Sequence, residues 1–333
     1  MSGEHQDRAL VIVLDGGYES YAQEEQMLQA AGYAFARFEG GRHDRAAKLD
    51  FARDAAGIFI RWSELDAATF DALPNLRCVV RYGAGYDNVD LEAATRRGVK
   101  VSNVQGYANE AVSDHTLALI LSCVRALPLG ARQLREHYAA PPRRHMPELK
   151  DMTLGIVGLG RIGGALCRKA RRLFQRVLAC DPYIPRPRFQ ELGALETPFA
   201  VLLRESDVVS IHCNLTEETT HLFDRSTFAK MRSTAILINT ARGPVVDEEA
   251  LLDALNAGTL HAAGLDVFHD EPPLANRDAL VAHPQVVATG HYAWYSNASH
   301  RELQRRAAQN MIAMLGGEYP EDCLNARELQ QRS

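Results

Sequence analysis

Short apolar runs alternate with longer stretches of helical spacing along most of this chain of 333 residues. The runs are rich in Val, Ile and Leu, and polar or glycine residues follow them, as in "LVIVLDGG". Strands that alternate with helices are typical of βαβ units, which build parallel sheets. We therefore predict strands over 9–14, 33–38, 57–62, 76–83 and 99–103, and then over 154–157, 177–180, 208–212, 235–239, 262–265 and 286–289.

The helical pattern is clearest in the stretch that separates the two sets of strands. Apolar residues between Leu117 and Val124 keep the i, i+3, i+4, i+7 spacing, which predicts one long helix over 108–127. Further helices are predicted over 21–31, 66–72 and 297–315. Because a chain of this length exceeds one ordinary core, the two sets of strands predict two α/β domains with parallel sheets.

Composition excludes several classes of protein. The chain has 37 Lys and Arg against 42 Asp and Glu, a net charge of −5, so no basic excess favours nucleic acid. The start, "MSGEHQDRAL", is too polar for a signal peptide, and no apolar run reaches the ~18–20 residues of a membrane span. The six cysteines are far apart and form no CxxC pair, which favours buried thiols and a cytoplasmic protein.

The segment "GLGRIG", residues 158–163, indicates a dinucleotide site. Gly158, Gly160 and Gly163 follow an apolar strand and open a helix, which is the context that a GxGxxG motif needs. These glycines allow a tight turn, the approach of a pyrophosphate and close helix–strand packing, and the helix N-terminus favours phosphate. Leu159, Arg161 and Ile162 complete the loop. The alternative is a βα turn with a structural role only.

Asp181 indicates which dinucleotide is bound. It stands 18 residues after Gly163, at the end of the next predicted strand. A carboxylate there can accept hydrogen bonds from the ribose hydroxyls and repels a 2′-phosphate, so NAD is expected rather than NADP. Arg186 and Arg188, which follow closely, weaken this preference slightly.

Three later strand ends carry a complementary set of side chains. Arg242 follows one predicted strand, Glu271 stands five residues after the end of the next at Asp266, and His291 lies just past the third. The carboxyl ends of parallel strands form the ligand-binding edge of such a sheet. An Arg can bind a carboxylate and polarise a carbonyl, a His can exchange a proton, and a carboxylate can orient the imidazole. Taken singly, each residue also fits a surface ion pair, a structural histidine or a turn.

The motifs resemble the D-isomer-specific 2-hydroxyacid dehydrogenases over nearly the whole chain. They are "VVRYGAGYDNVDLEAATRRGVKVSN", "GIVGLGRIG", "INTARGPVVDEEAL", "GLDVFHDEP" and "TGHYAWYS". The segments "GHYAWYS" and "CDPYI" resemble the branch that holds the C-terminal-binding proteins and phosphoglycerate-dehydrogenase-like relatives. The resemblance implies an NAD-dependent oxidoreductase acting on the CH–OH group of a 2-hydroxy acid.

The resemblance also implies an architecture. A flavodoxin-like substrate domain, 1–104 plus 296–333, would receive a Rossmann coenzyme domain, 105–295, as an insertion. A homodimer would form through the coenzyme domain.

The resemblance assigns further site residues. Arg242 would bind substrate, Glu271 would support His291, and His291 would donate the proton during reduction. The amides of Gly83 and Ala84 would hold the substrate carboxylate, although a plain glycine-rich turn would look the same. Also matched are Arg61, where some members place a cation, and the residues expected to line the nicotinamide and its ribose: Cys213, Thr219, Thr240, Ala241, Asp266 and Ala293.

Three positions need separate interpretation. Trp294 would wall off the substrate pocket and favour an apolar or sulfur-bearing tail, or it packs a domain interface. Gly290 stands where the family usually has Pro before its catalytic His, which predicts a looser turn. Gln105 replaces a common Pro near a predicted hinge, so domain closure is expected to differ.

Other functions remain open from the sequence. An NADH-responsive co-regulator with residual activity would keep the same residues. An S-adenosylhomocysteine hydrolase or alanine dehydrogenase shares the fold, but the Arg–Glu–His order argues against both. A metal enzyme is not expected, because His212, Cys213 and His269 offer no paired ligand spacing.

Overall fold

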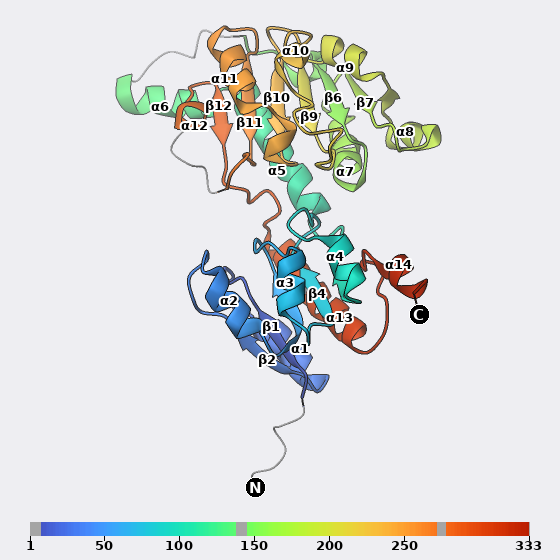
Figure 1. Cartoon of the computed structure of the whole chain (residues 1–333). Helices are drawn as coiled ribbons and strands as arrows, with labels where there is room; N and C mark the ends of the chain where they lie inside the picture. The colour runs from blue at the N-terminus through green and yellow to red at the C-terminus, as the bar shows by residue number, and fades with distance from the viewer. Residues whose placement is uncertain (1–7, 138–144, 272–277, 333) are drawn as a thin grey trace. The chain divides into compact units, whose positions relative to one another are not determined.

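The computed structural model describes residues 8–137, 145–271 and 278–332 (Figure 1). The chain divides into two compact units. The first contains the residues up to Tyr107 together with those from Ser296 onward, and the second contains Ala108–Tyr295. The second unit is therefore inserted, in sequence, into the first.

The first unit is built on a five-stranded sheet of order β2-β1-β3-β4-β5, in which neighbouring strands are parallel. This is the flavodoxin-like strand order. The strands are β1 (Leu10–Val13), β2 (Ala34–Arg37), β3 (Ala55–Ile60), β4 (Cys78–Arg81) and β5 (Lys100–Ser102). β3 is buried at every position, as expected for a strand covered on both faces.

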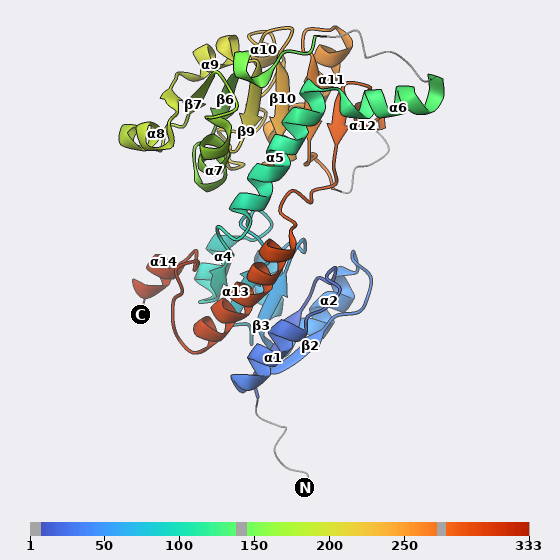
Figure 2. The ribbon, with the colours of Figure 1, turned by 180° about the vertical axis from the view of Figure 1, so that it is seen from behind.

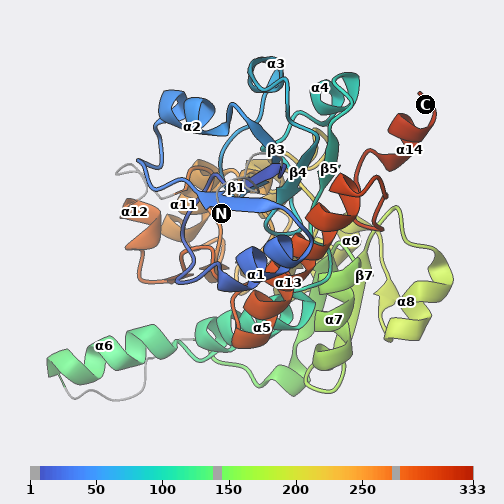
Figure 3. The same ribbon diagram turned by 90° about the horizontal axis from the view of Figure 1, so that it is seen from below.

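The described part of the first unit holds six α-helices. They are α1 (Ala22–Ala30), α2 (Arg45–Ala52), α3 (Ala67–Ala72), α4 (Leu91–Arg96), α13 (Asn297–Leu315) and α14 (Ala326–Gln330). Asp44, Asp66 and Asp90 cap α2, α3 and α4 by accepting a backbone N–H from the first turn. α13 lies beside α1 (Figure 3) and packs on β3 and β4.

The second unit holds a seven-stranded parallel sheet of order β12-β11-β10-β9-β6-β7-β8. Counted from β6, this is the Rossmann order 3-2-1-4-5-6 with a seventh strand at one edge. The strands are β6 (Thr153–Val157), β7 (Arg176–Cys180), β8 (Leu195–Glu196), β9 (Val208–Ile211), β10 (Ile236–Asn239), β11 (Ala262–Leu265) and β12 (Val286–Ala288).

Helices cover both faces of this sheet. α5 (Asn109–Val124), α7 (Arg161–Ala170) and α8 (Arg186–Leu192) enclose one apolar core (Figure 2). The other core is enclosed by α9 (Phe199–Glu205), α10 (Arg225–Phe228), α11 (Glu248–Asn256) and α12 (Asp278–Val281). α6 (Leu127–His137) and two 3-10 turns, η1 (Leu149–Asp151) and η2 (Gly243–Val245), complete the described elements of this unit.

The predicted fold class is confirmed: two parallel-sheet α/β domains, one of them Rossmann-like. The long helix expected over 108–127 is present as α5, but it ends at Val124 and a separate helix, α6, begins at Leu127. The break falls at Ala126, whose φ of 47° is unfavourable for a residue with a Cβ, just before Pro128. Within the described residues no single helix is long and apolar enough to span a membrane, although α5 and α6 pass that test as a pair bent by 55°.

Candidate active site

The carboxyl ends of the strands in the second unit line up along one edge of the sheet. The register pairs Val157 with both Cys180 and Ile211, and it pairs Leu265 with both Asn239 and Ala288. At about 4.8 Å per strand, the edge from β12 to β7 spans roughly 24 Å. The predicted residues that follow these strand ends are, in sheet order, His291, Asp266, Arg242, Cys213, Gly158 and Asp181.

The glycine loop has the shape of a phosphate cradle. Gly158 has a φ of +93°, and a Cβ there would lie 2.6 Å from the backbone nitrogen of Cys213. A Cβ on Gly163 would lie 2.1 Å from the carbonyl oxygen of Gly158, whereas one on Gly160 would meet no atom within 4 Å. The loop is therefore packed against β9 and α7 but open at Gly160. Arg161 begins α7, so the helix N-terminus faces this opening, and these residues fit a dinucleotide pyrophosphate.

Asp181 is held beside this loop by backbone hydrogen bonds. Its Oδ2 accepts the N–H of Leu159 at 2.7 Å, and its Oδ1 accepts the N–H of Tyr183 at 3.0 Å. Arg186 pairs with Glu196 and Arg188 pairs with Glu191. Arg186 and Arg188, which were expected to weaken the preference for NAD slightly, thus each form an ion pair with a nearby glutamate.

The remaining residues that the resemblance placed near the nicotinamide lie at strand ends or in the loops after them. Cys213 is the second residue after the end of β9, and burial raises the pKa of its thiol to about 11. The Thr219 hydroxyl donates to the carbonyl of Asn214 at 2.7 Å, so it shapes the loop after β9. Thr240 is buried after β10, where its hydroxyl lies 3.1 Å from that of Thr116 on α5.

Arg242 stands on a turn that a buried asparagine organises. The Asn239 side chain accepts the N–H of Ala241 at 3.0 Å and donates to the carbonyl of Arg242 at 2.9 Å. A Cβ on Gly243 would lie 1.9 Å from the carbonyl carbon of Phe268, so this turn packs directly on the chain after β11. Sequence reasoning missed Asn239, although a polar residue at the end of a buried strand was an available signal.

Glu271 and His291 form a hydrogen-bonded pair. Glu271 Oε1 accepts the N–H of Phe268 at 3.1 Å, and its Oε2 bonds to Nδ1 of His291. Burial acts to raise the pKa of Glu271, but the bond to His291 and the charges of His291 and Arg242 lower it overall. An ionised carboxylate only accepts hydrogen bonds, so Nδ1 is the donor and Nε2 is the ring nitrogen left for chemistry.

Asp266 organises the turn that carries His291. Its buried carboxylate accepts the Thr289 hydroxyl at 2.6 Å and the N–H groups of Tyr292 and Ala293 at 3.2 and 2.9 Å. Its backbone carbonyl accepts the N–H of His291 at 2.7 Å. Asp266 thus bonds chiefly to the turn after β12, and Ala293 is one of the residues that it holds there.

Trp294 is hydrogen-bonded within the same turn. Its Nε1 donates to the carbonyl of His291 at 3.0 Å, and its ring meets that of Tyr295 edge to face at 5.5 Å. The structure therefore ties Trp294 to the turn that carries the histidine.

The first unit carries the other three predicted residues at its own strand ends. Arg61 follows β3, and its guanidinium lies over the rings of Tyr18 and Trp62 at 5.3 and 4.9 Å. Gly83 and Ala84 follow β4, and Gly83 has a φ of +124° that only glycine adopts readily.

Asp15, which sequence reasoning missed, holds the loop that carries Arg61. Its Oδ2 accepts the N–H groups of Arg61, Trp62 and Ser63 at 2.8, 2.9 and 2.7 Å. Its Oδ1 pairs with Lys48 at 2.7 Å, and both side chains are buried.

Across the described residues no group of three His, Cys, Asp or Glu is placed to hold a metal ion. His212 is one of the histidines considered as metal ligands. Its Nε2 lies 2.9 Å from the hydroxyl oxygen of Ser210. Burial lowers the pKa of His212 to about 4, so its ring is neutral near pH 7.

A Rossmann sheet with a glycine loop, an aspartate held beside that loop and an Arg, a Glu and a His after neighbouring strands is typical of a dinucleotide-dependent oxidoreductase. Residues 117–293, more than half of the chain, match the family model described as the D-isomer specific 2-hydroxyacid dehydrogenase, NAD binding domain. The chain belongs to the D-isomer-specific 2-hydroxyacid dehydrogenase family, and its cofactor is NAD.

Individual relatives agree with this assignment. A glyoxylate reductase of Korarchaeum cryptofilum is 40% identical over 80% of this chain and 82% of its own length. A D-3-phosphoglycerate dehydrogenase of Archaeoglobus fulgidus is 36% identical over 77% of this chain and 48% of its own. The crystal structure of TT0316 protein from Thermus thermophilus has a TM-score of 0.85 at 34% identity, and covers 95% of this chain and 99% of that one.

The predicted family and the predicted class of enzyme are confirmed: the protein is an NAD-dependent D-2-hydroxyacid dehydrogenase. The relatives give no support to the C-terminal-binding protein branch or to a co-regulator function.

Proposed function

We propose that this enzyme reduces small 2-oxo acids of the glyoxylate and hydroxypyruvate type to the corresponding 2-hydroxy acids, with D configuration where the product is chiral. The reaction type rests on the hydrogen bond between Glu271 and His291 Nδ1, which leaves Nε2 of the ring available. The positive charge of Arg242 also acts on this pair, because it lowers the pKa of Glu271. The observation that favours a small substrate is the anchoring of Trp294 on the same turn, together with the glyoxylate reductase name of a relative.

Three side chains carry the chemistry in this proposal. Arg242 binds the substrate carboxylate and polarises the ketone, because a guanidinium can bind two oxygens at once. His291, as imidazolium, gives the proton on Nε2 to the ketone oxygen. Glu271 orients the ring and stabilises its charge before the proton leaves. Bound NADH supplies the hydride that the carbonyl carbon receives.

The cofactor residues have defined tasks. The 158–163 loop and the N-terminus of α7 hold the pyrophosphate, and Asp181 accepts hydrogen bonds from the adenosine ribose. Cys213, Thr219, Thr240, Ala241 and Ala293 line the nicotinamide end, and Asp266 keeps their neighbouring turn in place.

The first unit is the substrate domain in this proposal, and the second is the coenzyme domain. The amides of Gly83 and Ala84 bind the substrate carboxylate, and Arg61 adds positive charge near the substrate tail. Asp15 supports this role, because it fixes the backbone of the loop on which Arg61 stands.

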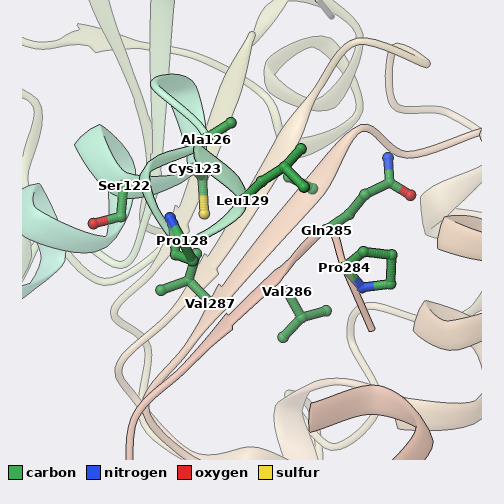
Figure 4. A pocket seen from close by; sticks show the side chains of 10 residues that line it. Ser122, Cys123, Ala126, Pro128, Leu129, Pro284, Gln285, Val286 and Val287 are labelled. Atoms are coloured by element: carbon green, nitrogen blue, oxygen red, sulfur yellow. The ribbon is translucent and has the colours of Figure 1, made fainter. Parts of the chain in front are cut away.

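The coenzyme unit is also the proposed dimer interface. α6 projects from this unit (Figures 1 and 3) and exposes 55% of Leu127 and 60% of Leu134. A small hollow of mixed polar and apolar lining, which includes Pro128, Leu129, Pro284 and Gln285, lies beside the start of α6 (Figure 4). Light scattering should give a dimer for the native chain and a monomer for Leu134→Glu.

The six cysteines are free thiols, which supports a reducing, cytoplasmic location.

The reaction is tested by a panel of 2-oxo acids with NADH and NADPH: glyoxylate, hydroxypyruvate, phosphohydroxypyruvate, phenylpyruvate and 4-methylthio-2-oxobutyrate. We expect NADH oxidation to be fastest with the first two acids.

His291→Gln should lower kcat by about 10²–10⁴-fold, while a fluorescence titration should show that NADH still binds. Arg242→Ala should lower kcat/KM on every accepted acid. The proposal fails if no 2-oxo acid is reduced, or if His291→Gln turns over normally.

A further inference from the structure

A histidine on helix α5 reaches the turn that carries His291. His115 Nε2 lies 2.9 Å from the Thr289 hydroxyl and 3.5 Å from Asp266 Oδ1. Its side chain is 17% exposed, and its ring meets that of Tyr292 edge to face at 5.1 Å. α5 packs against β10, β11 and β12, so it brings His115 to this turn from one face of the sheet (Figure 2).

The hydrogen-bond partners define the direction of each bond. The Asp266 carboxylate accepts the N–H groups of Tyr292 and Ala293, and its Oδ1 lies 2.6 Å from the Thr289 hydroxyl oxygen. A hydroxyl has one proton to donate, and Thr289 gives it to Asp266. The Thr289 oxygen is then an acceptor towards His115, so the ring donates its Nε2–H. The hydrogen bonds therefore run from His115 as donor to Thr289, and from Thr289 as donor to Asp266.

The turn needs such support because His291 has an unfavourable backbone conformation. Its φ is 54°, a left-handed value that is uncommon for a residue with a Cβ. Such conformations persist where surrounding contacts determine them. Here the contacts are the carbonyl and carboxylate of Asp266, the Trp294 bond to the His291 carbonyl, and the contact of Thr289 with His115.

We propose that His115 is a positioning residue for the dehydrogenase reaction, an inference that rests on the function proposed above. Through Thr289 and Asp266 it fixes the turn 289–294 and so sets the direction in which His291 presents Nε2. A displacement of about 1 Å at a reacting group can cost roughly 100-fold in rate. Loss of His115 should therefore lower kcat without changing how tightly NADH binds.

The test compares two amide substitutions in the full chain. In His115→Gln the side-chain NH₂ takes the place of Nε2 and can still donate to Thr289. In His115→Asn the amide is too short to reach it, although the residue stays polar. We expect His115→Asn to lower kcat by roughly 10–100-fold with KM for glyoxylate and Kd for NADH unchanged, and His115→Gln to recover most of the rate.

A matched control is His283→Gln. His283 lies just before β12, at the opposite end of the strand from the active turn, where its Nδ1 accepts the N–H of Gln285 at 3.2 Å. This variant should keep the native kcat. Melting temperatures of all variants show whether the fold is retained.

Two results would overturn the inference. One is a native kcat in His115→Asn. The other is an equal loss of kcat and of NADH affinity in both His115 variants, which indicates general damage to the unit. If the native protein reduces no 2-oxo acid, the proposed function fails instead, so the two failures are distinguishable.

Discussion

At the scale of single residues, the pair of Glu271 and His291 shows how burial and neighbouring charges together determine the pKa of a carboxyl group. Burial alone would raise the pKa of Glu271, yet the hydrogen bond to the imidazole of His291 and the charges of His291 and Arg242 lower it below its ordinary value. The carboxylate therefore remains charged at neutral pH and can stabilise an imidazolium 20 residues away in sequence.

Replacing Glu271 tests this coupling. Without the carboxylate, the ring of His291 loses the acceptor that orients Nδ1 and the charge that stabilises it during proton transfer. We expect Glu271→Gln to lower the reductive kcat/KM. Initial rates with saturating NADH measure this. Glu302→Gln on α13 is the control, and an unchanged kcat/KM in the Glu271 variant would contradict the coupling.

A second prediction at the residue scale concerns Asp181 and the preference for NADH over NADPH. A charge-assisted hydrogen bond is worth about 1.5–3 kcal/mol, or roughly 10–150-fold in binding. Asp181→Ser should weaken NADH binding by about this factor and improve NADPH binding, since the repulsion of a 2′-phosphate is removed. Fluorescence titration with both cofactors measures the change. An unaltered ratio of the two Kd values would remove Asp181 from the ribose site.

The strand-end positions of the proposed catalytic residues could be predicted from sequence, whereas the contact made by His115 could not. Arg242, Glu271 and His291 stand after apolar strands, and parallel sheets gather such residues at one edge. His115 lies 174 residues from Thr289 and sits inside a helical pattern, where a polar residue is expected to be exposed. Its partner follows from helix packing, which sequence spacing does not determine.

At the scale of elements, apolar runs located the longer strands, because both faces of these sheets are covered. Short helices such as α4 and α14 were missed, since six or fewer residues give too little periodicity. The break between α5 and α6 was also missed, because the apolar pattern continues through it. Pro128 was the available signal, as proline favours the first turn of a helix.

Gly290 gives an element-scale prediction. A Cβ there meets no atom within 4 Å and its φ is not in the left-handed range, so alanine fits without strain. Gly290→Ala should add about 0.4–1 kcal/mol of stability by restricting the unfolded chain, a rise in Tm of roughly 1–4 °C. Calorimetry measures it. The matched comparison is Gly158→Ala, which should lower Tm and abolish NADH binding, since its Cβ collides with Cys213. A fall in Tm for Gly290→Ala would show that the turn needs glycine.

At the scale of the whole molecule, a half-buried histidine that is neutral near pH 7 links stability to pH. The pKa of His212 is about 4 in the folded chain, below the ~6.5 of an unfolded one. Between these values the unfolded state binds more protons, so stability falls as pH drops from about 6.5 to about 4. The slope contributed is at most about 1.4 kcal/mol per pH unit.

His212→Gln should remove that slope. Urea unfolding at pH 7, 6 and 5 gives the free energy of unfolding for the native chain and the variant. Other titrating groups act equally in both and cancel in the difference. A difference that stays constant with pH would mean that His212 titrates normally in the folded state.

The inserted arrangement of the second unit has a consequence for synthesis on the ribosome. The sheet of the first unit emerges early, yet α13, which covers β3 and β4, is translated only after all of residues 108–295. The coenzyme unit has all its strands before that helix exists. The nascent chain therefore lacks the helix that covers β3 and β4 while another unit folds, and this interval is when a holding chaperone would be most useful.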